Sequence, residues 1–255
     1  MTYRSTIEEV ELVVNVKLLD DEKTVELSYE PREGLNTENL RLLDDSFWIT
    51  DAEKGCVVVP IREGLMIQSN SGLAFIHRFG TFDYEGCHME MLGVVKNNSA
   101  ILISWHNPYV TAEVKSTINT ATVLAKQVLS TSFDLTKTAR AVKIQFLGEG
   151  NYVTIAKAYR QVAKEKGWLV TWKEKLRKTP EAAKLFGASN FKLWHCIDRR
   201  LDYKLNEKFV TVNWTFKEVA EITEHLEDDL RIEHALFVIG GWIYRGYDNY
   251  HPDIL

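Results

Sequence analysis

The stretch that decides the fold class is Val10–Leu18, which reads Val-Glu-Leu-Val-Val-Asn-Val-Lys-Leu. Apolar residues occupy every second position from Val10 to Leu18, and polar residues fill most of the positions between them. This period of two predicts a half-buried β-strand. A second alternating run, residues 25–29, follows a turn at Asp20–Lys23, so the two runs together predict a β-hairpin.

Further short runs rich in β-forming residues continue the pattern as far as residue 147. They cover residues 47–50, 56–61, 65–68, 89–95, 100–105, 110–114, 121–129 and 141–147. Clusters of Gly, Asn and Asp separate them, for example Lys96–Ser99. Many short strands joined by turns, with no helical stretch between them, predict a β-sandwich domain over residues 1–150.

Composition and charge exclude several classes of protein. The 255 residues are 45% hydrophobic and 26% charged, which is typical of a globular protein, and the net charge of -5 argues against a nucleic-acid partner. No run approaches the roughly 18 apolar residues of a spanning helix, so no membrane partner is predicted. Three widely spaced cysteines and no secretory signal at the N-terminus predict a cytoplasmic protein, or a secreted one whose signal was removed.

The periodicity changes after residue 150. Apolar residues at helical spacing predict a helix from Tyr152 that ends at Gly167, and Thr179-Pro180-Glu181 predicts the start of a short second helix. We interpret residues 151–190 as linking helices. Residues 191–197 and 234–242 predict two strands, and Thr215 caps the helix expected between them. Residues 191–255 therefore predict a βαβ unit with a right-handed crossover.

A single βαβ unit leaves two open strand edges and one uncovered sheet face. The simplest interpretation is that residues 191–255 are the start of a truncated (β/α)8 barrel, of the TIM type. The alternative is that the two strands extend the sheet of the β-region. Taken as it stands, the chain is of the α+β class.

The richest candidate binding segment follows the second of these strands. Residues 240–253 read Gly-Gly-Trp-Ile-Tyr-Arg-Gly-Tyr-Asp-Asn-Tyr-His-Pro-Asp. In parallel α/β folds, ligands bind at the carboxyl ends of the strands. Aromatic rings stack on sugar C–H faces and carboxylates accept hydrogen bonds from sugar hydroxyls, which makes Trp242, Tyr247, Asp248, His251 and Asp253 candidate binding residues. The alternative is an ordinary loop in which the tyrosines pack as lids.

A second candidate segment ends the preceding strand. Trp194 and Arg199 would stand beside the first loop in a parallel sheet, and Arg199 could pair with Asp248 or Asp253 or hold a substrate anion. A structural ion pair is the alternative for the arginine. A catalytic Cys196 is not expected, because an apolar strand raises the pKa of a thiol.

A third segment, Glu85–Met91, would place His88 and Glu90 on one face of a strand. They could contribute to a metal site or contact a sugar, or they could form a polar surface pair. The sequence contains no GxSxG, GxxxxGK[ST], HExxH or GxGxxG motif, so no cofactor and no metal are predicted.

Three segments carry a resemblance to a known group of enzymes. They are Gly55–Gly64, Glu90–Lys96, and the pair Gly246-Tyr247-Asp248 and His251-Pro252-Asp253. On these residues the chain resembles glycosidases related to glycoside hydrolase families 101 and 129. Those families act on α-linked N-acetylgalactosamine and related sugars, and they join a large, supersandwich-like β-sandwich to a (β/α)8-type catalytic barrel.

The resemblance implies a role for this chain. Asp248 would lie at the sugar-binding end of the barrel, while Tyr247 stands where the family has His. The family's nucleophile and acid/base come from later strands, so the catalytic residues are unknown here. The chain would be the N-terminal fragment of a retaining glycoside hydrolase, inactive alone and prone to self-association through exposed barrel strands. The alternatives are a non-catalytic carbohydrate-binding module and a structural or interaction module.

Overall fold

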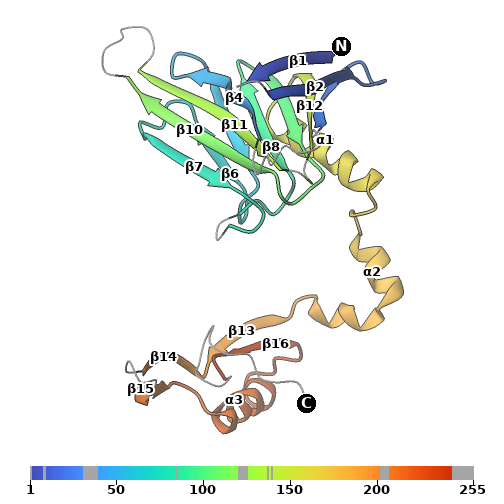
Figure 1. Cartoon of the computed structure of the whole chain (residues 1–255). Helices are drawn as coiled ribbons and strands as arrows, with labels where there is room; N and C mark the ends of the chain where they lie inside the picture. The colour runs from blue at the N-terminus through green and yellow to red at the C-terminus, as the bar shows by residue number, and fades with distance from the viewer. Residues whose placement is uncertain are drawn as a thin grey trace. The chain divides into compact units, whose positions relative to one another are not determined.

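The computed structural model describes residues 2–7, 10–30, 40–83, 86–119, 126–136, 138, 140–201 and 207–242. The chain divides into two compact units, Met1–Leu169 and Val170–Leu255. The first holds most of the strands (Figure 1). No helix in the described ranges is long and apolar enough to cross a membrane.

The larger sheet of the first unit joins strands from both ends of the β-region. Its strand order over the described residues is β1-β2-β3-β12-β9-β8-β5-β6, with every neighbouring pair antiparallel. The strands are β1 (Thr2–Ile7), β2 (Val10–Leu18), β3 (Thr24–Glu30), β5 (Gly55–Val59), β6 (Leu65–Gln68), β8 (Met91–Lys96), β9 (Ser99–Ser104) and β12 (Ala141–Glu149). The predicted hairpin is confirmed as β2 and β3, whose register pairs Val14 with Tyr29.

The smaller sheet has the order β4-β11-β10-β7 and is also antiparallel throughout. Its strands are β4 (Leu40–Thr50), β7 (Phe75–Phe79), β10 (Thr111–Ile118) and β11 (Gln127–Leu135). The end strand β4 is irregular: Leu43, Asp45 and Phe47 have left-handed backbone angles, and the register against β11 shifts twice. Of the strand predicted over residues 121–129, residues 121–125 lie outside the described residues, and the rest overlaps β11 from Gln127.

The two sheets enclose one apolar core, which confirms the predicted sandwich. Ile49, Leu92, Ile103 and Phe133 are completely buried in this core. Trp105 meets Phe133 edge-on, with ring centroids 6.0 Å apart. Side chains alternate along β9, because Ile101 and Ile103 face this core while Ala100 and Leu102 face the other side of the large sheet.

The outer face of the large sheet is covered in part by helix α1 (Tyr152–Glu165). The Asn151 side chain and Thr154 form a reciprocal N-terminal cap, and Gly167 follows the helix at φ +72. Ile155 packs so closely on β8 that a Cβ at Gly93 would lie 2.8 Å from its Cδ1 atom. The segment predicted as linking helices is thus divided, since α1 belongs to the first unit and the helices after Leu169 to the second.

In the described part of the second unit there are two small sheets and three helical segments. They are α2 (Trp172–Lys178), the 3-10 helix η1 (Pro180–Leu185), β13 (Ser189–Trp194), β14 (Cys196–Leu201), β15 (Glu207–Val212), α3 (Phe216–Asp228) and β16 (Ala235–Gly240). Strands β13 and β16 pair in parallel, from Ser189 with Ala235 to Trp194 with Gly240. Strands β14 and β15 form an antiparallel pair that the sequence did not predict.

The strand–helix–strand pattern over β13, α3 and β16 matches the predicted βαβ order. The alternative interpretation, in which these strands extend the sandwich sheet, is wrong, because within the described residues β13 and β16 form a sheet of their own.

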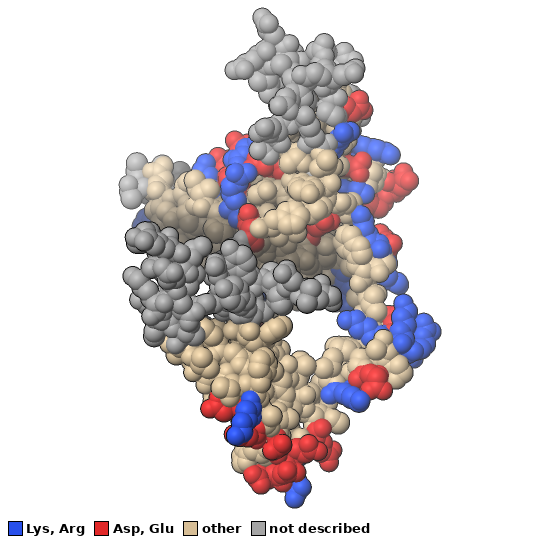
Figure 2. Space-filling model, turned by 60° about the horizontal axis from the view of Figure 1, so that its bottom comes forward, with Lys and Arg blue, Asp and Glu red and all other residues tan. Residues whose placement is uncertain are grey.

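Charge is segregated inside this unit. Basic residues dominate α2 and acidic residues dominate α3, visible as blue and red groups in Figure 2.

Candidate functional site

The candidate site lies at the carboxyl ends of β13 and β16. Because the strands are parallel, both carboxyl ends lie at one edge of the sheet. The pairing continues one residue past β13, where the His195 N–H donates to the Gly240 carbonyl at 2.8 Å. The two predicted candidate residues with described side chains, Trp194 and Trp242, are the last residue of β13 and the second residue after β16.

Trp194 is half-buried, and its ring is held over the end of β16. A Cβ at Gly240 would lie 2.4 Å from two carbon atoms of the indole ring, so only glycine leaves room for the ring there. The Lys192 ammonium lies 4.7 Å from the Trp194 ring centroid, which adds a cation–π contact on the same side of the strand. Trp194 is therefore an anchored aromatic side chain at the edge of the predicted site.

His195 lies on the opposite side of β13 and is only 7% exposed. Its ring packs against Phe216 at the start of α3, with centroids 4.4 Å apart. Its carbonyl accepts a hydrogen bond from the Asn213 N–H at 2.8 Å, but Nε2 is buried without a hydrogen-bond partner among the described residues. Strand alternation in a sequence can assign a histidine to one face, but it cannot show that a buried ring nitrogen has no partner.

The chain turns sharply after β16. Gly241 has a φ of +70, and a Cβ there would lie 2.1 Å from the Cys196 carbonyl oxygen. A side chain at this position would collide with the neighbouring backbone, so the close approach requires glycine. Trp242 follows directly and is 51% exposed, which leaves its ring accessible at this edge.

For the other predicted site residues the structure describes no side chain. Arg199 belongs to β14, where it pairs with Val210 of β15, and its side chain is outside the described part. Tyr247, Asp248, His251 and Asp253 fall beyond residue 242 and are also outside the described residues. Whether these residues meet Trp194 and Trp242 stays a prediction.

The described residues ahead of Met91 in the third candidate segment do not form the predicted strand. Residues 88–90 are bends that precede β8, and His88 is exposed while Glu90 is half-buried. The Glu90 N–H donates to the Tyr159 hydroxyl at 3.2 Å, and its Oε2 atom is buried without a partner among the described residues. Burial raises the pKa of the Glu90 carboxyl, with Lys166 opposing the shift. The two side chains therefore do not form the surface pair that strand alternation predicted.

Cysteine chemistry has no support in the sandwich. Cys56, Cys87 and Cys196 are all buried free thiols. Burial raises the pKa of Cys87 to about 12, helped by Asp83, and burial also raises the pKa of Cys56. Both sandwich thiols stay protonated at neutral pH and are poor nucleophiles. Across the described ranges no three His, Cys, Asp or Glu side chains are grouped as metal ligands would be.

Comparison with solved structures identifies the fold. The chain is similar to Alpha-N-acetylgalactosaminidase NagBb from Bifidobacterium bifidum over 100% of its own length and 45% of that enzyme. The TM-score is 0.74 at 17% identity for the GalNAc complex, 0.77 at 16% for the Gal-NHAc-DNJ complex and 0.71 at 17% for the ligand-free enzyme. No family model matches the chain, and no curated protein matches it in sequence.

The chain therefore has a glycosidase-like fold and spans less than half the length of the enzyme that it matches. At this level of identity the likeness defines the architecture and assigns no individual residue.

Proposed function

We propose that this chain is the sandwich and the first barrel strands of a retaining glycoside hydrolase that acts on α-linked, N-acetylgalactosamine-like sugars. The observation that carries the proposal is the match of the whole chain, second unit included, to an enzyme named as an alpha-N-acetylgalactosaminidase. The parallel pair β13 and β16 with α3 between them supports it, because this unit is the repeating element of a (β/α)8 barrel.

In this proposal the carboxyl ends of β13 and β16 form part of a sugar-binding rim. Trp242 supplies an exposed ring for stacking, and Trp194, anchored over Gly240, fixes the shape of the rim. The residues predicted from the sequence hold the substrate through its hydroxyl and amide groups; they are Arg199, Tyr247, Asp248, His251 and Asp253.

The catalytic step needs residues beyond this rim. A retaining enzyme uses two carboxyl groups about 5–5.5 Å apart, one as the nucleophile and one as the acid/base. By resemblance both come from later barrel strands, and Asp248 positions the substrate. The 255-residue chain alone is therefore inactive in this proposal. The proposal also includes self-association through the uncovered strand β16, where the apolar side chains of Leu236 and Val238 are 40% and 47% exposed.

The test uses the product of the complete open reading frame that contains these residues and an aryl α-N-acetylgalactosaminide as substrate. Asp248→Asn should lower kcat/KM about 100-fold or more, because a positioning contact to the sugar is lost. Trp242→Ala should raise KM. The control is Trp48→Ala, which removes a sandwich tryptophan of similar exposure (52% against 51%) and should leave KM and kcat/KM unchanged.

Two outcomes would count against the proposal. One is hydrolysis of the same substrate by the 255-residue chain alone. The other is a complete protein that cleaves no α-linked amino sugar, or whose activity responds equally to Trp242→Ala and Trp48→Ala.

A second candidate function is carbohydrate binding by the sandwich without catalysis. Phe82 and Tyr109 are 72% and 55% exposed on neighbouring loops, with ring centroids 5.5 Å apart. The Tyr109 N–H donates to Asn107 Oδ1 at 3.0 Å, which fixes the loop that carries the ring. Glycan-array binding by the 255-residue chain that is lost in Phe82→Ala would favour this function over the first.

A further inference from the structure

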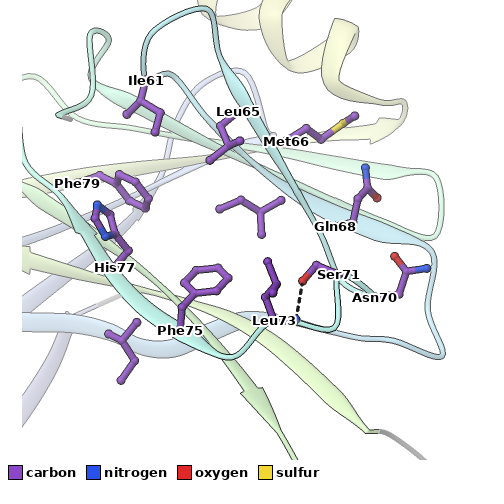
Figure 3. A pocket seen from close by; sticks show the side chains of 12 residues that line it. Ile61, Leu65, Met66, Gln68, Asn70, Ser71, Leu73, Phe75, His77 and Phe79 are labelled. Carbon is purple, nitrogen blue, oxygen red and sulfur yellow. Dashed lines mark hydrogen bonds between the residues drawn. The ribbon is translucent and has the colours of Figure 1, made fainter.

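The sandwich is open at the end where β6 and β7 lie. Each is the last strand of its sheet, and a short loop, residues 69–74, joins them. Between the two strands lies a cavity of about 670 Å³ (Figure 3). Ligand pockets typically enclose roughly 300–1,000 Å³, so this cavity is large enough for a small molecule.

The cavity is continuous with the apolar core of the sandwich. Its floor includes Ile67 and Phe79, which are 8% and 3% exposed and belong to that core. Its walls carry Leu65, Leu73 and Ile76, which are 43%, 64% and 63% exposed. Packed sheets lie about 10 Å apart, so the slot admits a hydrocarbon chain or a flat ring in a single layer.

Polar side chains are confined mostly to one end of the cavity. Gln68, Asn70 and Ser71 lie together there, away from Phe79 and His77 at the other end (Figure 3). Within the described part of the chain, the Gln68 and Asn70 side-chain amides make no hydrogen bond, so both can donate to or accept from a ligand.

The loop that carries Asn70 and Ser71 is held in place from inside the sandwich. The Gln127 side chain donates to the Ser71 hydroxyl at 2.9 Å and accepts from the Gly72 N–H at 2.9 Å. The same amide also donates to Ser116 Oγ at 2.8 Å. The polar end is therefore built before any ligand arrives.

We propose that this cavity binds an uncharged amphiphile, with a hydrocarbon chain or ring between the sheets and a hydroxyl or amide head at Gln68 and Asn70. The ligand is uncharged because no Asp, Glu, Lys or Arg lines the cavity, and a buried charge without a partner is costly. The site is independent of the proposed glycosidase rim, since it lies wholly in the first unit.

The experiment measures binding of 1-hexanol, 1-octanol and 1-decanol to the full 255-residue chain by titration calorimetry. Each added methylene should raise the affinity about fourfold, the equivalent of about 0.8 kcal/mol of buried CH₂. Octanoate at pH 8 should bind at least about tenfold more weakly than 1-octanol, because its charge meets no partner in the cavity.

Substitutions locate the ligand. Leu73→Trp fills the mouth of the cavity from an exposed position and should abolish binding, whereas Leu18→Trp, at a similarly exposed leucine on β2, should leave it unchanged. Gln68→Ala with Asn70→Ala should weaken 1-octanol binding roughly threefold to tenfold, the value of one or two hydrogen bonds.

Three results would overturn the proposal: no saturable binding of any alcohol, affinities that do not depend on chain length, or equal binding by the Leu73→Trp and Leu18→Trp variants. Sedimentation supplies a further criterion. If wild-type chain forms dimers that Leu73→Trp abolishes and the alcohols do not compete with, the cavity is a contact between copies of the chain and not a ligand site.

Discussion

The two units of the chain show how much a second packed layer adds to the burial of a sheet's apolar side chains. In the sandwich, Leu92, Ile103 and Phe133 are completely buried because two sheets face each other. In the second unit, Phe191 and Phe237 stack at 5.2 Å on neighbouring parallel strands, yet both stay half-buried. A two-stranded sheet with one helix cannot cover both of its faces, so its apolar residues contribute less to stability than similar residues in the sandwich.

The sharpest test of this difference is one substitution made in both units. Phe133→Ala should lower the free energy of unfolding of the sandwich by about 3–5 kcal/mol, because it empties a completely buried site. Phe237→Ala should cost about 1–2 kcal/mol, since part of its ring stays in contact with water. Urea unfolding with amide hydrogen exchange reports the two units separately. Equal losses for the two variants would mean that the second unit has a closed core.

A smaller effect is expected from ion pairs. On the outer face of the small sheet, Arg41 donates to Asp134 at 2.8 and 3.1 Å and to Glu113 at 2.9 and 2.9 Å, and Arg78 also bonds Asp134. The hydrogen bonds to Asp134 and then to Glu113 raise the pKa of Arg41. The two carboxylate side chains are only 7% and 10% exposed, so they depend on the arginine.

Arg41→Met should therefore destabilise the sandwich by about 1–3 kcal/mol. The matched variant in the second unit is Lys217→Met, which breaks a 3.6 Å pair with Glu221 between two exposed side chains. Little or no loss is expected there, because exposed pairs contribute little. Thermal unfolding of both variants checks the comparison, and a larger loss for Lys217→Met would contradict it.

The smallest effect is a difference in pH dependence between the units. Burial raises the pKa of Glu90 above 4.5, so its carboxylate destabilises the folded sandwich as pH rises through that raised pKa. In α3, hydrogen bonds from the Thr215 N–H and hydroxyl lower the pKa of Glu218, whose stabilising effect is lost as pH falls through the lowered value.

Glu90→Gln should stabilise the chain at pH 7 by less than about 1 kcal/mol, after allowance for solvent screening, and should give no gain below pH 4.5. Glu218→Gln should slightly weaken α3 at pH 7 and have no effect in acid. Unfolding midpoints and α3 amide exchange from pH 3 to 8 measure both. A gain from Glu90→Gln that persists at pH 3 would show that removal of the charge is not its cause.

Periodicity was sufficient to predict the sandwich but not its details. The alternation in Val10–Leu18 predicts β2 correctly, although burial does not alternate along it: residues 13–16 are all partly buried and Leu18 is 59% exposed. Strand β7 was missed because Phe-Ile-His-Arg-Phe does not alternate clearly, and its position as an end strand exposes Ile76 on the cavity side. The β14–β15 pair was missed because its start at Cys196 follows β13 after one residue, with no Gly or Pro between them.

The candidate site was predictable only as a place on the fold. A run of apolar residues before Trp242 indicates a strand and places Trp242 just after the carboxyl end of that strand. Parallel pairing then brings Trp194 to the same edge of the sheet. The sequence could not show that Gly240 makes room for the Trp194 ring, because that contact depends on the register between two strands 46 residues apart. The roles of Asp248 and its neighbours stay predictions.

The irregular strand β4 has a consequence for how copies of this protein can meet. Left-handed residues at Leu43, Asp45 and Phe47 break the even spacing of backbone N–H and C=O groups along that margin, at a cost of about 1 kcal/mol or more each. An incoming strand from another molecule would find its hydrogen bonds out of step there, so fibril-like growth cannot continue through this side of the small sheet.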